Sequence, residues 1–186
     1  MTHDPLFQSR GGYRNLKAFT MAEIISDATA AFCRRFVDPR SRTTDQMIQA
    51  ARSCKQNIAE GSLASATSSS TELKLTSVAR ASLEELMLDY EDYLRHNQLS
   101  RWEPDSQKQK YIAAIAKTNP KSYGAYQPYI EEKSAETAAN TMICIIKQTN
   151  YLLDQLIKAQ KKGFVENGGF SEQLCTGRSR ARKPKP

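Results

Sequence analysis

The side chains whose chemistry is clearest in this chain are basic. The last nine residues, RSRARKPKP, hold five of the seven excess positive charges and no acid, which leaves a net charge of +2 on the rest. Such a segment can bind phosphate groups by counterion release, with a strong dependence on salt, or it can be a solvated tail that aids solubility. We expect a disordered basic tail over residues 176–186. Its candidate nucleic-acid-binding residues are Arg178, Arg180, Arg182, Lys183 and Lys185.

Four more basic residues lie on two predicted helices. On the second helix Arg52 lies about opposite the apolar line and Lys55 on its flank, and on the third helix Lys74 and Arg80 flank the apolar stripe. On a single subunit they would be scattered surface charges. In a symmetric ring they would recur, and a repeated basic surface attracts a phosphate backbone.

Residue patterns for catalysis or metal binding are missing. The four cysteines form no C-x-x-C pair, and with only His3 and His96 a zinc cluster of the usual spacing is not available. Cys33 and Cys54 sit in or beside apolar stripes, as packing thiols do. No Glu-x-x-His pair and no Gly-rich phosphate loop occurs. We therefore expect no enzyme activity, no metal and no cofactor.

Composition places the chain among globular proteins. Its 186 residues are 39% hydrophobic and 25% charged, which suits one domain with a real core. No apolar run approaches the roughly 20 residues that span a bilayer. The first residues, MTHDPLFQSR, lack a secretory apolar segment. We expect a cytoplasmic protein without membrane contact.

The elements that position the basic residues are long helices. Apolar residues recur at helical spacing over about 15–37, 44–60, 71–97 and 134–162. We predict an all-α fold, an up-and-down antiparallel four-helix bundle over 13–162. An insertion over 98–133 holds a short helix near 105–117 and an ordered loop with Tyr123, Tyr126 and Tyr129. Tyrosines so interleaved can stack on bases, but packing against the core is favoured.

Local signals predict where the second and third helices begin and end. Thr43-x-x-Gln46 and Ser69-x-x-Glu72 read as capping boxes. The stretch Asn57 to Gly61 should end the second helix, because a glycine just past the last periodic residue can take the left-handed conformation.

The last long helix carries two apolar stripes side by side. One holds Met142, Ile145, Thr149, Leu152 and Leu156, and the other Ile143, Ile146, Asn150, Leu153 and Ile157. Together they are wider than a two-helix seam, so the insertion or another subunit should cover one of them. After Gly163 we predict a suffix over 163–175 that docks through Phe164, Val165, Phe170 and Leu174.

The segments NIAEGS and SVARASLEEL, the opening YRNLKAFTMAEIISDATAAFCRRF and the closing TMICIIKQTNYLLDQLIKAQKKGFVENGGFSEQL carry a family resemblance. Over roughly residues 13–175 the chain resembles the four-helix-bundle proteins encoded by intervening sequences of 23S ribosomal RNA genes. Relatives of that family include the accessory variability proteins of diversity-generating retroelements, and the closing segment is similar to the suffix of one subgroup.

The resemblance implies a homo-oligomer, often a barrel-like pentamer, that binds RNA or DNA and a partner reverse transcriptase through basic surface. The matching positions here are Arg52, Lys55, Lys74 and Arg80. We therefore expect a non-catalytic, oligomeric nucleic-acid-binding accessory protein. The alternative is a protein–protein interaction scaffold that binds no nucleic acid.

Overall fold

The computed structural model describes residues 12–118, 122–168 and 175, and within them it contains helices and no strand. The prediction of an all-α fold is confirmed. The helices are α1 (Lys17–Phe36), α2 (Arg42–Ala64), α3 (Ser69–His96), α4 (Gln107–Lys117), α5 (Gln127–Glu131) and α6 (Ala135–Asn167), with 3-10 turns η2 (Tyr13–Asn15) and η3 (Tyr123–Ala125).

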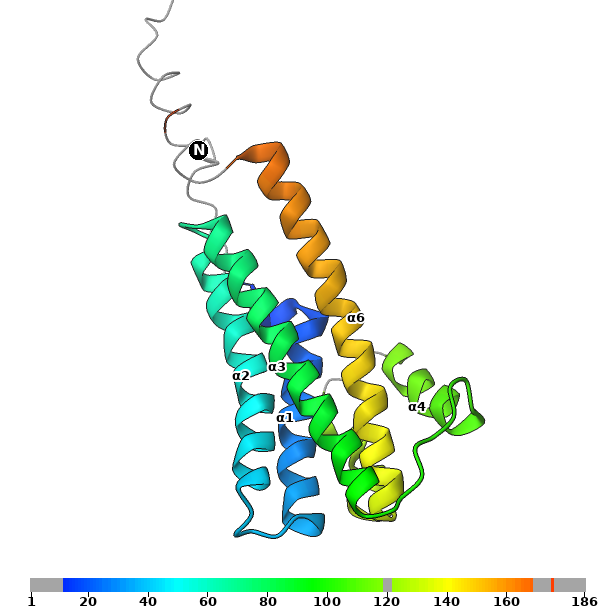
Figure 1. Cartoon of the computed structure of the whole chain (residues 1–186). Helices are drawn as coiled ribbons and strands as arrows, with labels where there is room; N and C mark the ends of the chain where they lie inside the picture. The colour runs from blue at the N-terminus through cyan, green and yellow to red at the C-terminus, as the bar shows by residue number, and fades with distance from the viewer. Residues whose placement is uncertain (1–11, 119–121, 169–174, 176–186) are drawn as a thin grey trace, which may run out of the picture.

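The four long helices run alternately in opposite directions, α1 and α3 one way and α2 and α6 the other (Figure 1). Helix α2 packs on α1 and α3, and α6 also packs on both of them. Each long helix therefore has two long neighbours. Among the described residues, no helix combines the length and the apolar character that crossing a membrane requires.

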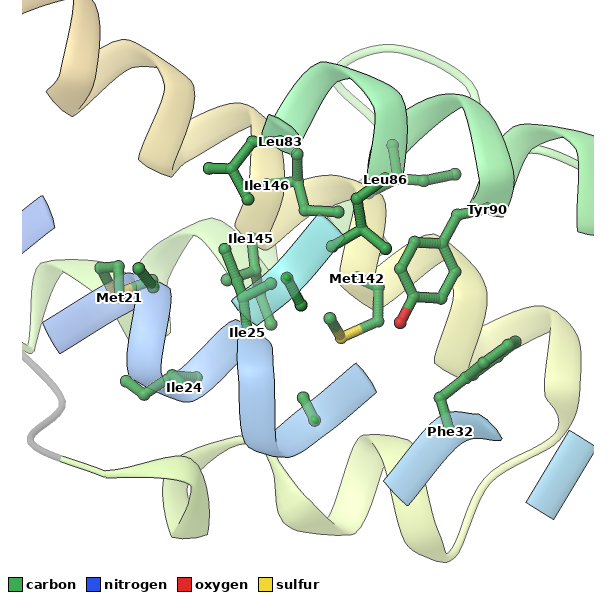
Figure 2. Close-up of a cluster of buried hydrophobic side chains, with 14 of the residues drawn as sticks. Met21, Ile24, Ile25, Phe32, Leu83, Leu86, Tyr90, Met142, Ile145 and Ile146 are labelled. Carbon is green, nitrogen blue, oxygen red and sulfur yellow. The ribbon is translucent and has the colours of Figure 1, made fainter. Parts of the chain in front are cut away.

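The core forms where the apolar stripes of these helices meet. Figure 2 shows side chains of α1, α3 and α6 converging, among them Ile25, Leu86 and Met142. The hydroxyl of Tyr90 donates a 3.1 Å hydrogen bond to Oγ1 of Thr29 inside this core. Helix α2 contributes the line that its spacing predicts, Met47, Ala51, Cys54 and Ile58.

Helix α2 continues through the stretch that we expected to end it. Gly61 is buried within the helix, whose last residue is Ala64. A Cβ at this position would lie 3.3 Å from both the Glu72 carbonyl oxygen and Cβ of Leu75. Gly61 thus allows the close approach of α2 and α3, and the prediction of a helix-ending glycine was wrong.

The residues that cap α2 and α3 are not the predicted Thr43 and Ser69 but lie one or two positions before them. The hydroxyl of Ser41 accepts from the Thr43 N–H at 3.2 Å and caps α2. The hydroxyl of Ser68 accepts from the Thr71 N–H at 3.1 Å and caps α3. Each helix start offers several hydroxyl side chains, and the one with extended backbone just before the first turn acts as the cap.

The insertion covers α6. Helices α4 and α5 both pack on α6, and α5 also packs on α1. Between Ala138 and Asn150 the buried residues of α6 include both stripes, with Met142 and Ile143 each at most 2% exposed. The second apolar stripe is therefore buried largely within the chain itself over this part of α6.

Helix α6 also passes the position where the suffix was expected to begin. It continues through Gly163 to Asn167 and ends at Gly168, whose φ is 68°. Phe164 is 39% and Val165 is 83% exposed, so the prediction that these two side chains dock was wrong. Phe170, Leu174 and the tail 176–186 lie outside the described residues.

Candidate functional site

The basic residues predicted on α2 and α3 do not form one patch. Ser53 of α2 hydrogen bonds to Ser82 of α3 at 2.9 Å, so this side of α2 faces α3. Lys55 follows Ser53 by two residues and lies about 200° round the helix, away from α3. Lys74 precedes Arg80 by six residues, which separates the two by about 120° round α3. Arg52 and Lys74 are exposed.

Arg80 already has two carboxylate partners. Its guanidinium contacts Glu84 at 2.6 Å and Asp154 of α6 at 3.2 Å. Asn150 of α6 donates to the same Glu84 carboxylate at 3.3 Å. The spacing of Arg80 and Glu84 in the sequence is that of a surface pair on one helix, and the structure adds the contact with Asp154, which joins α3 to α6. The other five candidates, Arg178, Arg180, Arg182, Lys183 and Lys185, lie outside the described residues.

The structure instead gathers aromatic and basic side chains in the insertion. A groove of about 650 Å³ lies where α4, the segment after α5 and the start of α6 meet. We call it the aromatic groove. It is lined by Trp102, Gln107, Lys108, Lys110, Tyr111, Ile112, Tyr129, Lys133 and Thr137. None of these lining residues, all within the described part of the chain, is acidic.

Trp102 is fixed by a buried asparagine of α6. The Trp102 main-chain N–H donates to Oδ1 of Asn140 at 2.8 Å, and Nδ2 of Asn140 donates to the Ser100 carbonyl at 2.9 Å. The indole is 8% exposed, and its Nε1–H is buried without an acceptor among the described residues. Lys108 Nζ lies 5.7 Å from the centroid of the indole ring, within the range of a cation–π contact.

Two tyrosines form the aromatic wall of the groove. The rings of Tyr111 and Tyr129 lie 6.0 Å apart between centroids at an angle of 58°. Hydrogen bonding to Tyr111, together with burial, raises the pKa of Tyr129 to about 12. At neutral pH the Tyr129 hydroxyl therefore adds no negative charge to a groove that already holds three lysines.

Helix α5 positions Tyr129 because it is anchored from two sides. Ile130 and Tyr126 are fully buried, and Arg35 of α1 donates to the Ile130 carbonyl. Tyr123 is partly buried and donates to the Glu131 carboxylate at 3.0 Å. The prediction that the tyrosine loop packs on the core thus holds for Tyr123, Tyr126 and Tyr129, and Tyr129 also lines the groove.

A third surface is acidic. A groove between α2 and α3 is lined by Asp45, Glu85 and Asp89, together with Arg42 and the Ser53–Ser82 pair. Burial raises the pKa of Asp89, and the neighbouring Asp92 and Glu85 raise it further. Within the described residues, no group of three His, Cys, Asp or Glu side chains could hold a metal ion. This surface would repel a phosphate backbone.

Sequence reasoning missed Trp102, Lys108, Lys110, Tyr111 and Lys133. They come from a loop, a helix and a second loop, so no single motif joins them. One signal was present: α4, QKQKYIAAIAK, carries three lysines and no acid.

Comparisons of the chain with protein-family models, with curated proteins and with solved structures found no match.

Proposed function

We propose that this chain is a non-catalytic, up-and-down four-helix-bundle protein that binds single-stranded RNA or DNA through the aromatic groove. The observation that carries the proposal is the composition of the groove. The described lining includes Trp102, Tyr111 and Tyr129 together with Lys108, Lys110 and Lys133, and it includes no acidic residue.

Single-strand binders combine these two kinds of side chain. Base stacking on an aromatic ring contributes about 1–3 kcal/mol per base and tolerates any sequence. Lysines release counterions from phosphates, which makes the affinity fall with salt. Tyr111 is 61% exposed and offers a ring face to a base, while Trp102 forms part of the floor. The bases of an intact duplex are stacked on each other and cannot use such a surface.

Trp102 is the only tryptophan in the sequence, so tryptophan fluorescence reports directly on the aromatic groove. We expect oligo(dT) and oligo(U) to change the Trp102 fluorescence on binding. With three lysine–phosphate contacts, log K should fall with log salt concentration at a slope of about −2. Tyr111→Ala should weaken binding by roughly 5- to 150-fold, the equivalent of one stacked base.

A matched variant separates the aromatic groove from general charge. Arg52→Gln removes one exposed charge of α2, whereas Lys110→Gln removes one from the groove. The proposal requires the larger loss of affinity from Lys110→Gln. Binding that is absent at about 50 mM salt, or that does not respond to salt, contradicts it.

A wider proposal rests on the sequence resemblance. We infer that the protein assembles as a homo-oligomer, with a pentamer favoured, and acts as an accessory to a reverse transcriptase. Arg52, Lys55, Lys74 and the tail from Arg178 to Lys185 would then add phosphate contacts around the assembly. Native mass spectrometry measures the subunit number, and a monomer at all concentrations would contradict this wider proposal.

A further inference from the structure

A second basic groove lies on the other flank of α4. Its volume is about 520 Å³, and α1, α4 and α6 all contribute to it. Lys17, Lys117 and Lys147 lie in its lining, with Met21, Leu152 and Tyr151. None of its described lining residues is acidic. We call it the α1 groove.

The two grooves present similar side chains. Each contains three lysines and one tyrosine that is largely exposed, Tyr111 at 61% in the aromatic groove and Tyr151 at 64% in the α1 groove. An exposed tyrosine ring beside lysines suits a base attached to phosphates. The same ligand chemistry therefore fits both grooves.

Helix α4 separates the grooves and also connects them. Ile112 is buried against the body of the protein, whereas Lys110 and Lys117 are exposed. These two lysines are seven residues apart, so they lie on the same side of α4, about 10 Å from each other. Lys110 lines the aromatic groove and Lys117 lines the α1 groove. The outer side of α4 between the two grooves is thus positively charged.

We infer that one nucleic-acid strand occupies both grooves and crosses the outer side of α4 between Lys110 and Lys117. This inference rests on the proposed function and extends it with a second binding site. Charge complementarity selects the occupant, because the described lining of each groove includes three lysines, one exposed tyrosine and no acidic residue. Helix α4 has 11 residues and is about 16 Å long, so the path suits on the order of 5 to 10 nucleotides.

Oligonucleotide length tests the inference. We would measure the affinity of oligo(dT) of 3, 6, 10 and 15 nucleotides for the full chain by fluorescence anisotropy. The affinity should rise steeply with length and then level off near 10 nucleotides. Tyr151→Ala and Lys147→Gln should each weaken binding of the 10-mer at least 5-fold and change binding of the 3-mer less than 2-fold. Both residues are exposed, and thermal melting checks that the variants fold.

The matched variants are Tyr111→Ala in the aromatic groove and Lys161→Gln, which removes an exposed charge of α6 outside both grooves. Tyr111→Ala should weaken all lengths, and Lys161→Gln should weaken none. If Tyr151→Ala and Lys147→Gln leave the 10-mer unaffected while Tyr111→Ala weakens it, the second site is wrong and the proposed function stands. If no oligonucleotide binds the unaltered chain, both are wrong.

Discussion

The main-chain N–H of Trp102 donates a 2.8 Å hydrogen bond to the side-chain oxygen of Asn140, a residue 38 positions later in the chain. Asn140 is 2% exposed and also donates to the carbonyl oxygen of Ser100. One buried amide therefore pairs with two main-chain groups of the loop that leads into α4. The position of Trp102 in the aromatic groove depends on this contact.

Replacing Asn140 with alanine should destabilise the protein and weaken binding together. The Trp102 N–H and the Ser100 carbonyl would lose a buried partner, at a cost of about 1–3 kcal/mol in the free energy of unfolding. Asn150→Ala is the matched control, because Asn150 is also buried in α6 but contacts Glu84 of α3. Urea unfolding should show a loss in both variants. Oligonucleotide affinity should fall only in Asn140→Ala, and an equal fall in both would mean that Asn140 acts through stability alone.

Two glycines within helices should respond differently to the same change. In Gly163→Ala the new Cβ meets nothing within 4 Å, so the higher helix propensity of alanine should stabilise the protein by up to about 1 kcal/mol. In Gly61→Ala the same gain is offset by contacts of 3.3 Å with Glu72 and Leu75. Gly61→Leu should cost about 1–3 kcal/mol or more, because α2 and α3 would be forced apart. A Gly61→Leu protein of unchanged melting temperature would show that the two helices do not approach as described.

Stability should fall at alkaline pH because of buried thiols. Burial raises the pKa of Cys33 and Cys144 from 9.0 to about 11 and that of Cys54 from 9.0 to about 12. Below pH 9 the thiols are protonated in the folded and the unfolded chain alike. Above pH 9 the unfolded chain loses these protons first, so each thiol costs up to about 1.4 kcal/mol per pH unit until its folded pKa is reached.

Urea midpoints between pH 8 and 11, in the presence of a reductant, measure this loss. Cys54→Ala should reduce the slope with pH, whereas Cys175→Ala, at an exposed position, should leave it unchanged. An identical slope in all three proteins would assign the alkaline loss to other groups.

Arg80 should matter for stability more than for binding. Arg80→Gln leaves Glu84 and Asp154 without their shared partner, and because the pair is partly exposed the cost should be about 0.5–1 kcal/mol at low salt. The cost should shrink in 1 M NaCl, where exposed charges are screened. Arg95→Gln removes a more exposed pair with Asp92 on the same helix and should cost less. If Arg80→Gln lowered the oligonucleotide affinity more than Lys110→Gln does, Arg80 would belong to the binding surface.

Periodic features of the fold could be predicted from the sequence, and close contacts could not. The spacing of Met47, Ala51, Cys54 and Ile58 is sufficient to define a buried helix face, because burial repeats with the helix period. The role of Gly61 was missed because a glycine that ends a helix and one that admits a neighbouring helix look the same until the neighbour is known. The caps Ser41 and Ser68 were missed because adjacent hydroxyl residues compete for the same position.

The aromatic groove could not be predicted for a different reason. Trp102, Tyr111 and Tyr129 lie on separate segments with no common period, and only the packing of α4 and α5 on α6 brings them together. The basic residues that could be assigned to elements from the sequence lie on regular helices. They are Arg52, Lys55, Lys74 and Arg80. Arg52 and Lys55 share a face of α2, Lys74 lies on α3, and Arg80 is already paired.

Helix α6 is one continuous helix, but the way in which it packs on the rest of the protein changes along its length. Up to Leu153 the helix is held by buried apolar side chains, whereas beyond Leu153 no described residue is buried. In this last part the contacts of α6 with α3 include the Arg80–Asp154 ion pair and a 3.0 Å hydrogen bond from Gln160 to Thr76. Amide hydrogen exchange should therefore divide the helix into two cooperative units. The part beneath the insertion should exchange only on global unfolding, and the last turns should exchange by local opening. The end of the molecule that carries both grooves is thus the one that persists longest in the native state.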